Sequence, residues 1–166
     1  MLLCSLSRQD KLDIFNEIET QKHIIGQAIE KDWWVCVILK VLFSSRYSDN
    51  IVFKGGTSLS KGWHLIERFS EDIDIAIQRE LLGYGGNLSK TQISDKLRRA
   101  SCTFVRTELK NAVSEGLLAL GIAKNQFNIF VEETSVTTVD PEKIYIEYES
   151  VYEGSTNEYI RPRVII

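Results

Sequence analysis

Two aspartates lie one residue apart in a stretch that has the pattern of a half-buried β-strand. Asp72 and Asp74 flank Ile73, and polar and apolar residues alternate from 72 to 78. Alternation places both carboxylates on one face of the strand, with their α-carbons roughly 6.6 Å apart. Carboxylates this close repel each other unless a cation lies between them, so the pattern favours a metal site.

Magnesium is the cation that fits this donor set. It prefers oxygen ligands and is usually held by one or two carboxylates together with substrate phosphates. Two such ions about 3.5–4 Å apart can hold both the attacking and the leaving oxygen of a phosphoryl displacement. We therefore expect Asp72 and Asp74 to bind magnesium, as two ions, and to act in catalysis.

A glycine pair before this strand is a candidate for phosphate binding. Gly55 and Gly56 follow a short apolar run, and Thr57 and Ser58 come where a helix is expected to begin. Glycine lets a backbone approach a ligand closely, and the amide groups of a helix N-terminus attract anions. Alone, paired glycines usually form a plain turn, and Asp-x-Asp is usually a solvated strand face. The order of the two motifs along the chain favours a site for a nucleoside triphosphate.

Basic residues near these motifs are weaker candidates. Arg68 can contact a triphosphate oxygen or pair with Glu71. Lys54 and Lys61 flank the glycine turn, but exposed lysines are common and need no ligand. A basic run between 96 and 110 can meet a nucleic acid backbone, although a solvated helix face explains it more simply.

The elements that must position these residues alternate between helix and strand, which predicts one domain of the α/β (α+β) class over residues 1–166. A capping box at Ser7 and Asp10 precedes the first helix, and Asp140 and Pro141 form a turn. The periodicity predicts helices over 11–22, 27–45, 57–68 and 91–120, the last ending at Gly121, and strands over 51–53, 72–78, 127–132, 144–149 and 159–166.

Composition limits the class of protein. The chain has 166 residues, 43% of them hydrophobic, which is enough for a core, and a net charge of -3. This charge argues against a protein that coats nucleic acid electrostatically. The chain has three widely spaced cysteines, and no signal peptide or membrane-spanning stretch is apparent, so we expect a cytoplasmic protein.

The two central motifs are similar to the signature of the DNA polymerase β-like nucleotidyltransferase superfamily, a glycine pair with serine or threonine followed by D-x-D. The longer strings over 54–61 and 68–74 resemble the AbiEii toxin nucleotidyltransferase family. Segments 30–34 and 159–164 also resemble parts of that family. The resemblance thus touches segments across the whole chain.

The resemblance implies a nucleotidyltransferase fold with a mixed sheet flanked by helices. It implies an enzyme of a toxin–antitoxin or abortive-infection system, with a cognate antitoxin, that transfers a nucleoside monophosphate from a triphosphate with magnesium. Some relatives use the 3′ end of tRNA, which makes tRNA the expected acceptor. The superfamily also uses a third carboxylate on a neighbouring strand, and Glu147 or an acidic residue just beyond Ile166 is the candidate.

Other interpretations remain open at this point. Family members are usually longer, with a helical C-terminal half that carries further lysine and aspartate motifs, and none of these is present here. The chain can therefore be a truncated, catalytically incomplete domain that binds nucleotide or a partner. An antibiotic-modifying nucleotidyltransferase shares the core motif, but the string over 68–74 favours the toxin family.

Overall fold

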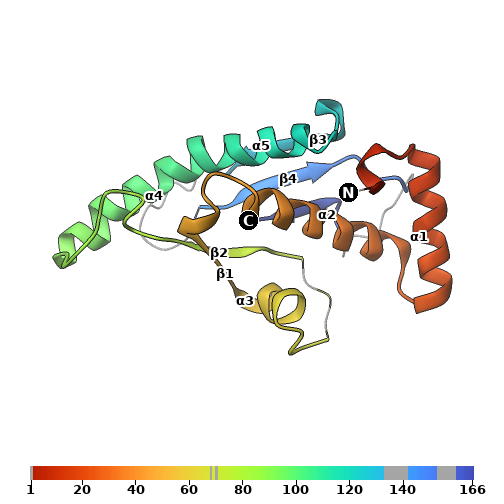
Figure 1. Ribbon diagram of the computed structural model, residues 1–166, viewed down its shortest axis with the longest axis horizontal. Helices are drawn as coiled ribbons and strands as arrows, with labels where there is room; N and C mark the ends of the chain where they lie inside the picture. The colour runs from red at the N-terminus through yellow and green to blue at the C-terminus, as the bar shows by residue number, and fades with distance from the viewer. Residues whose placement is uncertain (1, 68, 70, 133–141, 153–159) are drawn as a thin grey trace.

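The N-terminal part of the chain forms two long helices, as the sequence predicts. The computed structural model describes residues 2–67, 69, 71–132, 142–152 and 160–166 (Figure 1). Helix α1 (Arg8–Lys22) begins after Ser7, and Ser7 and Asp10 form the expected capping box. Helix α2 (Gly26–Phe43) has ten buried residues, so it must be covered on several sides.

The strands form two antiparallel groups. In the first, β1 (Ile51–Lys54) pairs with β2 (Asp74–Ile77). In the second, β4 (Ile144–Tyr148) pairs with β3 (Phe127–Val131) on one side and with β5 (Arg163–Ile165) on the other. The predicted strands over 51–53, 127–132 and 144–149 are confirmed.

A parallel bridge joins the two groups just before β2. Asp72 lies beside Ile165, and the Ile73 N–H donates to the Ile165 carbonyl oxygen at 2.8 Å. The chain that enters β2 is therefore a neighbour of β5, and parallel and antiparallel pairings occur together. Helices with small sheets of this kind confirm the expected α+β class.

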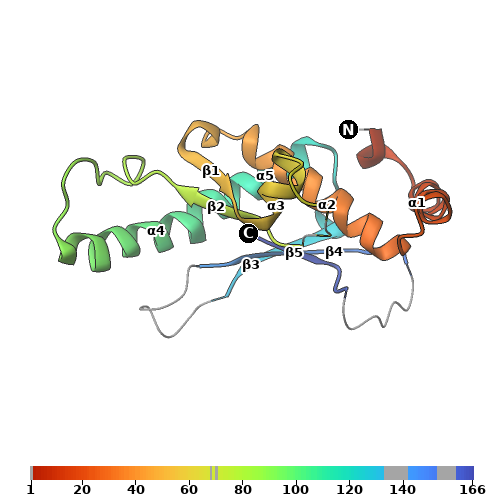
Figure 2. The same ribbon diagram turned by 90° about the horizontal axis from the view of Figure 1, so that it is seen from below.

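The long helix over 91–120 is confirmed, and Gly121, at a φ of 86°, follows its end. Its consecutive segments are η4 (Gln92–Leu97), α4 (Arg98–Phe104), η5 (Val105–Leu109) and α5 (Lys110–Ala119). Short 3₁₀ turns are η1 (Leu2–Ser5), η2 (Ser48–Asn50) and η6 (Lys124–Gln126). Figure 2 shows α2 and α5 on the same side of the sheet formed by β3, β4 and β5.

The hydrophobic core lies between the helices and the face of this sheet that packs against them. Ile144, Ile146 and Val164 are fully buried there, and the Tyr148 ring stacks on Trp34 of α2 at 4.8 Å. On the opposite face, residues such as Glu147 are exposed. Because bridged residues share a face, Asp72 lies on this open face as well.

The helix after the glycine pair differs from the prediction. It covers α3 (Gly55–Thr57) and η3 (Ser58–Gly62), whereas the sequence predicts 57–68 with Thr57 or Ser58 as the N-cap. The prediction of its length was wrong because the chain leaves the helix after Gly62 and reaches a left-handed conformation, with a φ of 52°, at His64.

Three other expectations concern the strands and the turn. The alternation over 72–78 is confirmed, since Ile73 is buried and Asp72, Asp74 and Gln78 are exposed. The strand itself is shorter than predicted, because β2 covers Asp74–Ile77 and Asp72 forms an isolated bridge before it. The last predicted strand is shorter than 159–166, since β5 covers three residues. The turn predicted at 140–141 lies outside the described residues.

A buried carboxylate holds the chain after β4 against α2. Glu30, only 2% exposed, accepts from Ser150 Oγ at 2.6 Å and from the Val151 N–H at 2.9 Å. Burial raises the pKa of Glu30, although the hydrogen bonds from Ser150 and Val151 and the charges of Lys11 and Arg8 oppose the shift.

Replacing Glu30 by alanine is expected to lower the free energy of unfolding by about 2–3 kcal/mol, because the buried Val151 N–H loses its acceptor. Urea unfolding measures the effect. Glu17→Ala, an exposed glutamate in α1, is the control and is expected to change stability by less than about 0.5 kcal/mol. Equal effects of the two substitutions would contradict a structural role for Glu30.

Candidate functional site

The glycine turn and the second aspartate are in direct contact. Gly55 directly follows β1 and has a φ of 72°, a left-handed conformation that favours glycine. A Cβ at this position would lie 2.0 Å from Asp74 Oδ2, so the contact has room only for glycine. In the antiparallel register Asp74 lies opposite Lys54, the residue before the turn. The two sequence motifs therefore form one site.

The two hydroxyls after the glycines tie the turn to the strand. Thr57 and Ser58 are 3% and 4% exposed. Thr57 Oγ1 donates to the carbonyl oxygen of Asp72, and Ser58 Oγ donates to the Gly55 carbonyl oxygen at 2.9 Å. The two hydroxyls are thus used in hydrogen bonds within the protein. The backbone N–H groups of Gly56 and Thr57, in the first turn of the helix, are the groups suited to an anion.

The carboxylates of Asp72 and Asp74 have the exposure that metal ligands need. Both residues are exposed on the same face, while Ile73 between them is 1% exposed. No hydrogen bond or ion pair joins either carboxylate to another described side chain. The described residues contain no group of three or more histidine, cysteine or acidic side chains suited to a metal. Two carboxylates that leave the other positions to substrate phosphates and water fit magnesium.

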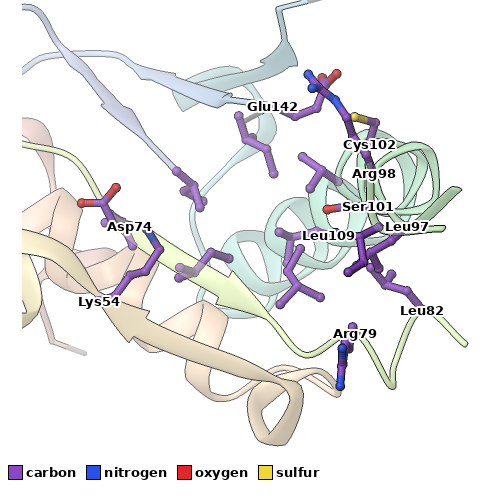
Figure 3. Close-up of a pocket in the computed structure, with 17 residues that line it drawn as sticks. Lys54, Asp74, Arg79, Leu82, Leu97, Arg98, Ser101, Cys102, Leu109 and Glu142 are labelled. Carbon is purple, nitrogen blue, oxygen red and sulfur yellow. The ribbon is translucent and has the colours of Figure 1, made fainter. Parts of the chain in front are cut away.

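A cavity of about 450 Å³ lies beside Asp74 (Figure 3). Lys54 and Asp74 lie at one end of it, and apolar side chains of β2 and of the long helix form much of its lining. The Ile73 N–H donates to the Ile165 carbonyl oxygen of β5. Backbone N–H and C=O groups of alternate residues point to the same edge of a strand, so those of Ile75 and Ile77 point to this edge as well. Both residues line the cavity. The volume is within the range of small-molecule sites.

Comparison with known families identifies the chain. A family model described as "Nucleotidyl transferase AbiEii toxin, Type IV TA system" matches residues 38–166, which include the glycine turn and both aspartates. The chain belongs to the AbiEii family. The family resemblance seen in the sequence is thereby confirmed, although segment 30–34 lies outside the matched residues. The family is one of nucleotidyltransferase toxins. No curated protein and no solved structure matches the chain.

The structure does not bring Glu147 of this AbiEii chain together with the two aspartates. Glu147 pairs with Arg163 on β5, whereas Asp72 bridges Ile165, two residues further along the same strand. At about 4.8 Å between strands and about 3.3 Å per residue, the α-carbons of Glu147 and Asp72 are roughly 12 Å apart. This is too far for one shared ion.

The parallel register shows where the other candidate for a third carboxylate would lie. Successive positions on one face of a strand are two residues apart. Ile165 lies beside Asp72 in a parallel bridge. In the same register, the residue that follows Ile166 would share the face of Ile165 and would lie beside Asp74. An acidic residue there in a longer chain would meet the sequence expectation.

The basic candidates differ in their surroundings. Arg68 lies outside the described residues. Lys54 is exposed next to Asp74. Lys61 forms an ion pair with Asp32 of α2 at 2.7 Å. Burial lowers the pKa of Lys61, but the hydrogen bond to Asp32 and the interactions with Cys36 outweigh it and raise the pKa above its usual value.

Sequence reasoning missed the contribution of α2 to this site. Lys31, the residue before Asp32, forms an ion pair with Glu71, which directly precedes Asp72. The signal in the sequence was a run of three adjacent charged residues, Glu30, Lys31 and Asp32, in a helix that is otherwise strongly apolar. In the described part of the chain, no helix is long and apolar enough to cross a membrane.

Proposed function

We propose that this AbiEii protein transfers a nucleoside monophosphate from a nucleoside triphosphate to tRNA in a magnesium-dependent reaction. The observation that carries the proposal is the contact between Gly55 and Asp74. It brings a backbone turn that is suited to an anion next to Asp74, which shares an exposed face with Asp72. A triphosphate carries several negative charges along a short chain, and it needs donors and cations at this spacing.

Each part of the site has a role in this reaction. Backbone N–H groups at Gly56 and Thr57 would hold the outer phosphates. Asp72 and Asp74 would hold magnesium, which when bound neutralises charge on the phosphates and polarises the reacting phosphate. The cavity beside Asp74 would take the nucleoside. An acceptor hydroxyl oxygen bonds to the α-phosphorus, the bond to the bridging oxygen breaks, pyrophosphate leaves and the hydroxyl proton passes to solvent.

The proposed partners follow from the family and from this chemistry. The acceptor hydroxyl is proposed to be at the 3′ end of tRNA, which places the reaction in the cytoplasm. The family description names a toxin of a type IV toxin–antitoxin system, so a cognate antitoxin is the proposed regulator.

A second candidate function is a domain that binds nucleotide or a partner without turning the nucleotide over. The observation that favours it is the distance of Glu147 from the aspartates. Glu147 therefore does not supply a third carboxylate beside Asp72 and Asp74. Such a domain would still bind a triphosphate with magnesium, because that binding needs the turn and the two aspartates alone.

Label transfer separates the two functions. The protein is incubated with magnesium, tRNA and each of the four α-labelled triphosphates in turn, beside an Asp72→Ala/Asp74→Ala variant. Label on the tRNA that is absent with the variant supports the transferase. Magnesium-dependent triphosphate binding without transfer supports the binding domain. Absence of binding to all four triphosphates contradicts both.

A further inference from the structure

Two consecutive residues of α2 contact the two halves of the site. The Lys31 ammonium donates to Glu71 Oε2, and Glu71 directly precedes Asp72. The Asp32 carboxylate accepts from Lys61 at 2.7 Å, and Lys61 lies in the helix that follows the glycine turn. Helix α2 therefore reaches both the phosphate-binding segment and the metal-binding segment.

The burial of Lys31 is unusual for a charged side chain. Its side chain is 3% exposed, whereas that of Glu71 is 41% exposed. Removing an ammonium from water is costly, and the attraction to one partner often fails to repay the cost. The ion pair is therefore weak evidence for a contribution to stability, and its value to the molecule lies in the geometry that it imposes.

That geometry concerns the direction in which Asp72 points. Side chains alternate along a strand, so Glu71 and Ile73 face the core side while Asp72 faces the open side. The chain here is held to β5 through a single parallel bridge at Asp72. Strand β2 is held separately by β1, so a slip of one residue confined to segment 71–73 would turn Asp72 away from Asp74 and bring Glu71 onto the open face. Lys31 opposes this slip because it holds Glu71 on the core side.

We propose that Lys31 is a positioning residue, which acts through Glu71 to keep Asp72 beside Asp74, and that Asp32 holds the glycine-turn helix through Lys61. The inference rests on the proposed function, since it assigns Lys31 to the same site. It makes α2 the fixed support against which the phosphate-binding and metal-binding segments are aligned.

The test compares Lys31→Met, Glu71→Gln and the double variant with the unchanged chain. Methionine keeps the length and apolar stem of lysine without its charge. Lys11→Met is the matched control, because Lys11 is also a buried lysine, 6% exposed, and lies over the Trp33 ring. Hydrogen exchange of segments 55–62 and 71–75 is measured without ligand. Binding of each of the four triphosphates is measured with magnesium.

Lys31→Met is expected to speed exchange in segment 71–75, and also in segment 55–62, because Thr57 donates to the carbonyl oxygen of Asp72. It is expected to weaken triphosphate binding about tenfold or more, while the urea midpoint changes little. The double variant is expected to bind as weakly as the Lys31 variant, since Lys31 acts through Glu71. Lys11→Met is expected to leave exchange in these segments and binding unchanged.

Unchanged exchange in Lys31→Met would overturn the inference, whatever the binding result. Additive losses in the double variant would overturn it as well, because the two residues would then act separately. If the unchanged chain binds no triphosphate, the proposed function fails, and faster exchange confined to the two segments would still support the role of Lys31.

Discussion

Replacing Asp74 by asparagine is expected to lower nucleotide transfer about 10³-fold and to leave the fold intact. The amide has the shape of the carboxylate, so the close contact with Gly55 is kept. The negative charge that would hold magnesium is lost. Because Asp74 is exposed, its neutralisation is expected to change the free energy of unfolding by less than about 0.5 kcal/mol.

The measurement is the rate of label transfer over a range of magnesium concentrations, with urea unfolding as the check on folding. Asp72→Asn is expected to behave in the same way. Glu147→Gln is the comparison: an exposed acidic residue on the same face but roughly 12 Å from Asp72 is expected to change the rate less than about threefold. An equal loss in the Glu147 variant would show that Glu147 takes part in the reaction. Full activity of Asp74→Asn would refute the metal site.

The parts of the site that could be predicted depend on local patterns. Alternation over 72–78 is a property of neighbouring residues, and it correctly placed Asp72 and Asp74 on one exposed face. The helix N-cap at Ser7 and the end of the long helix at Gly121 are similarly local. Such local patterns are sufficient to predict the α+β class and to recognise the two motifs and their order along the chain.

The parts that could not be predicted depend on register between distant segments. The sequence shows Glu147 on a strand, but its distance from Asp72 follows from the pairing of β4 with β5 and of Ile165 with Asp72. The contact of Lys31 with Glu71 likewise joins an N-terminal helix to the strand region. Pairing between segments far apart in sequence has no local signal, because it depends on how the whole chain packs.

Replacing Gly55 by alanine is expected to lower nucleotide transfer about 10²-fold, because small displacements of reacting groups have effects of this size. The new Cβ would lie 2.0 Å from Asp74 Oδ2 and 2.7 Å from Asp74 Cγ, so the carboxylate must move. The φ of 72° adds backbone strain, and stability is expected to fall by about 1–3 kcal/mol. Transfer rates and urea unfolding give the two effects.

Gly83→Ala separates the clash from the strain. Gly83 has a φ of 81°, but no atom lies within 4 Å of a Cβ built there. This variant is expected to lose about 1–2 kcal/mol of stability and to keep its transfer rate. Equal rates for the two variants would mean that the position of Asp74 beside the glycine turn does not matter for the reaction. A loss confined to Gly55→Ala would mean that the first glycine serves the metal ligand as well as the phosphate, since its missing side chain is the space that the Asp74 carboxylate occupies.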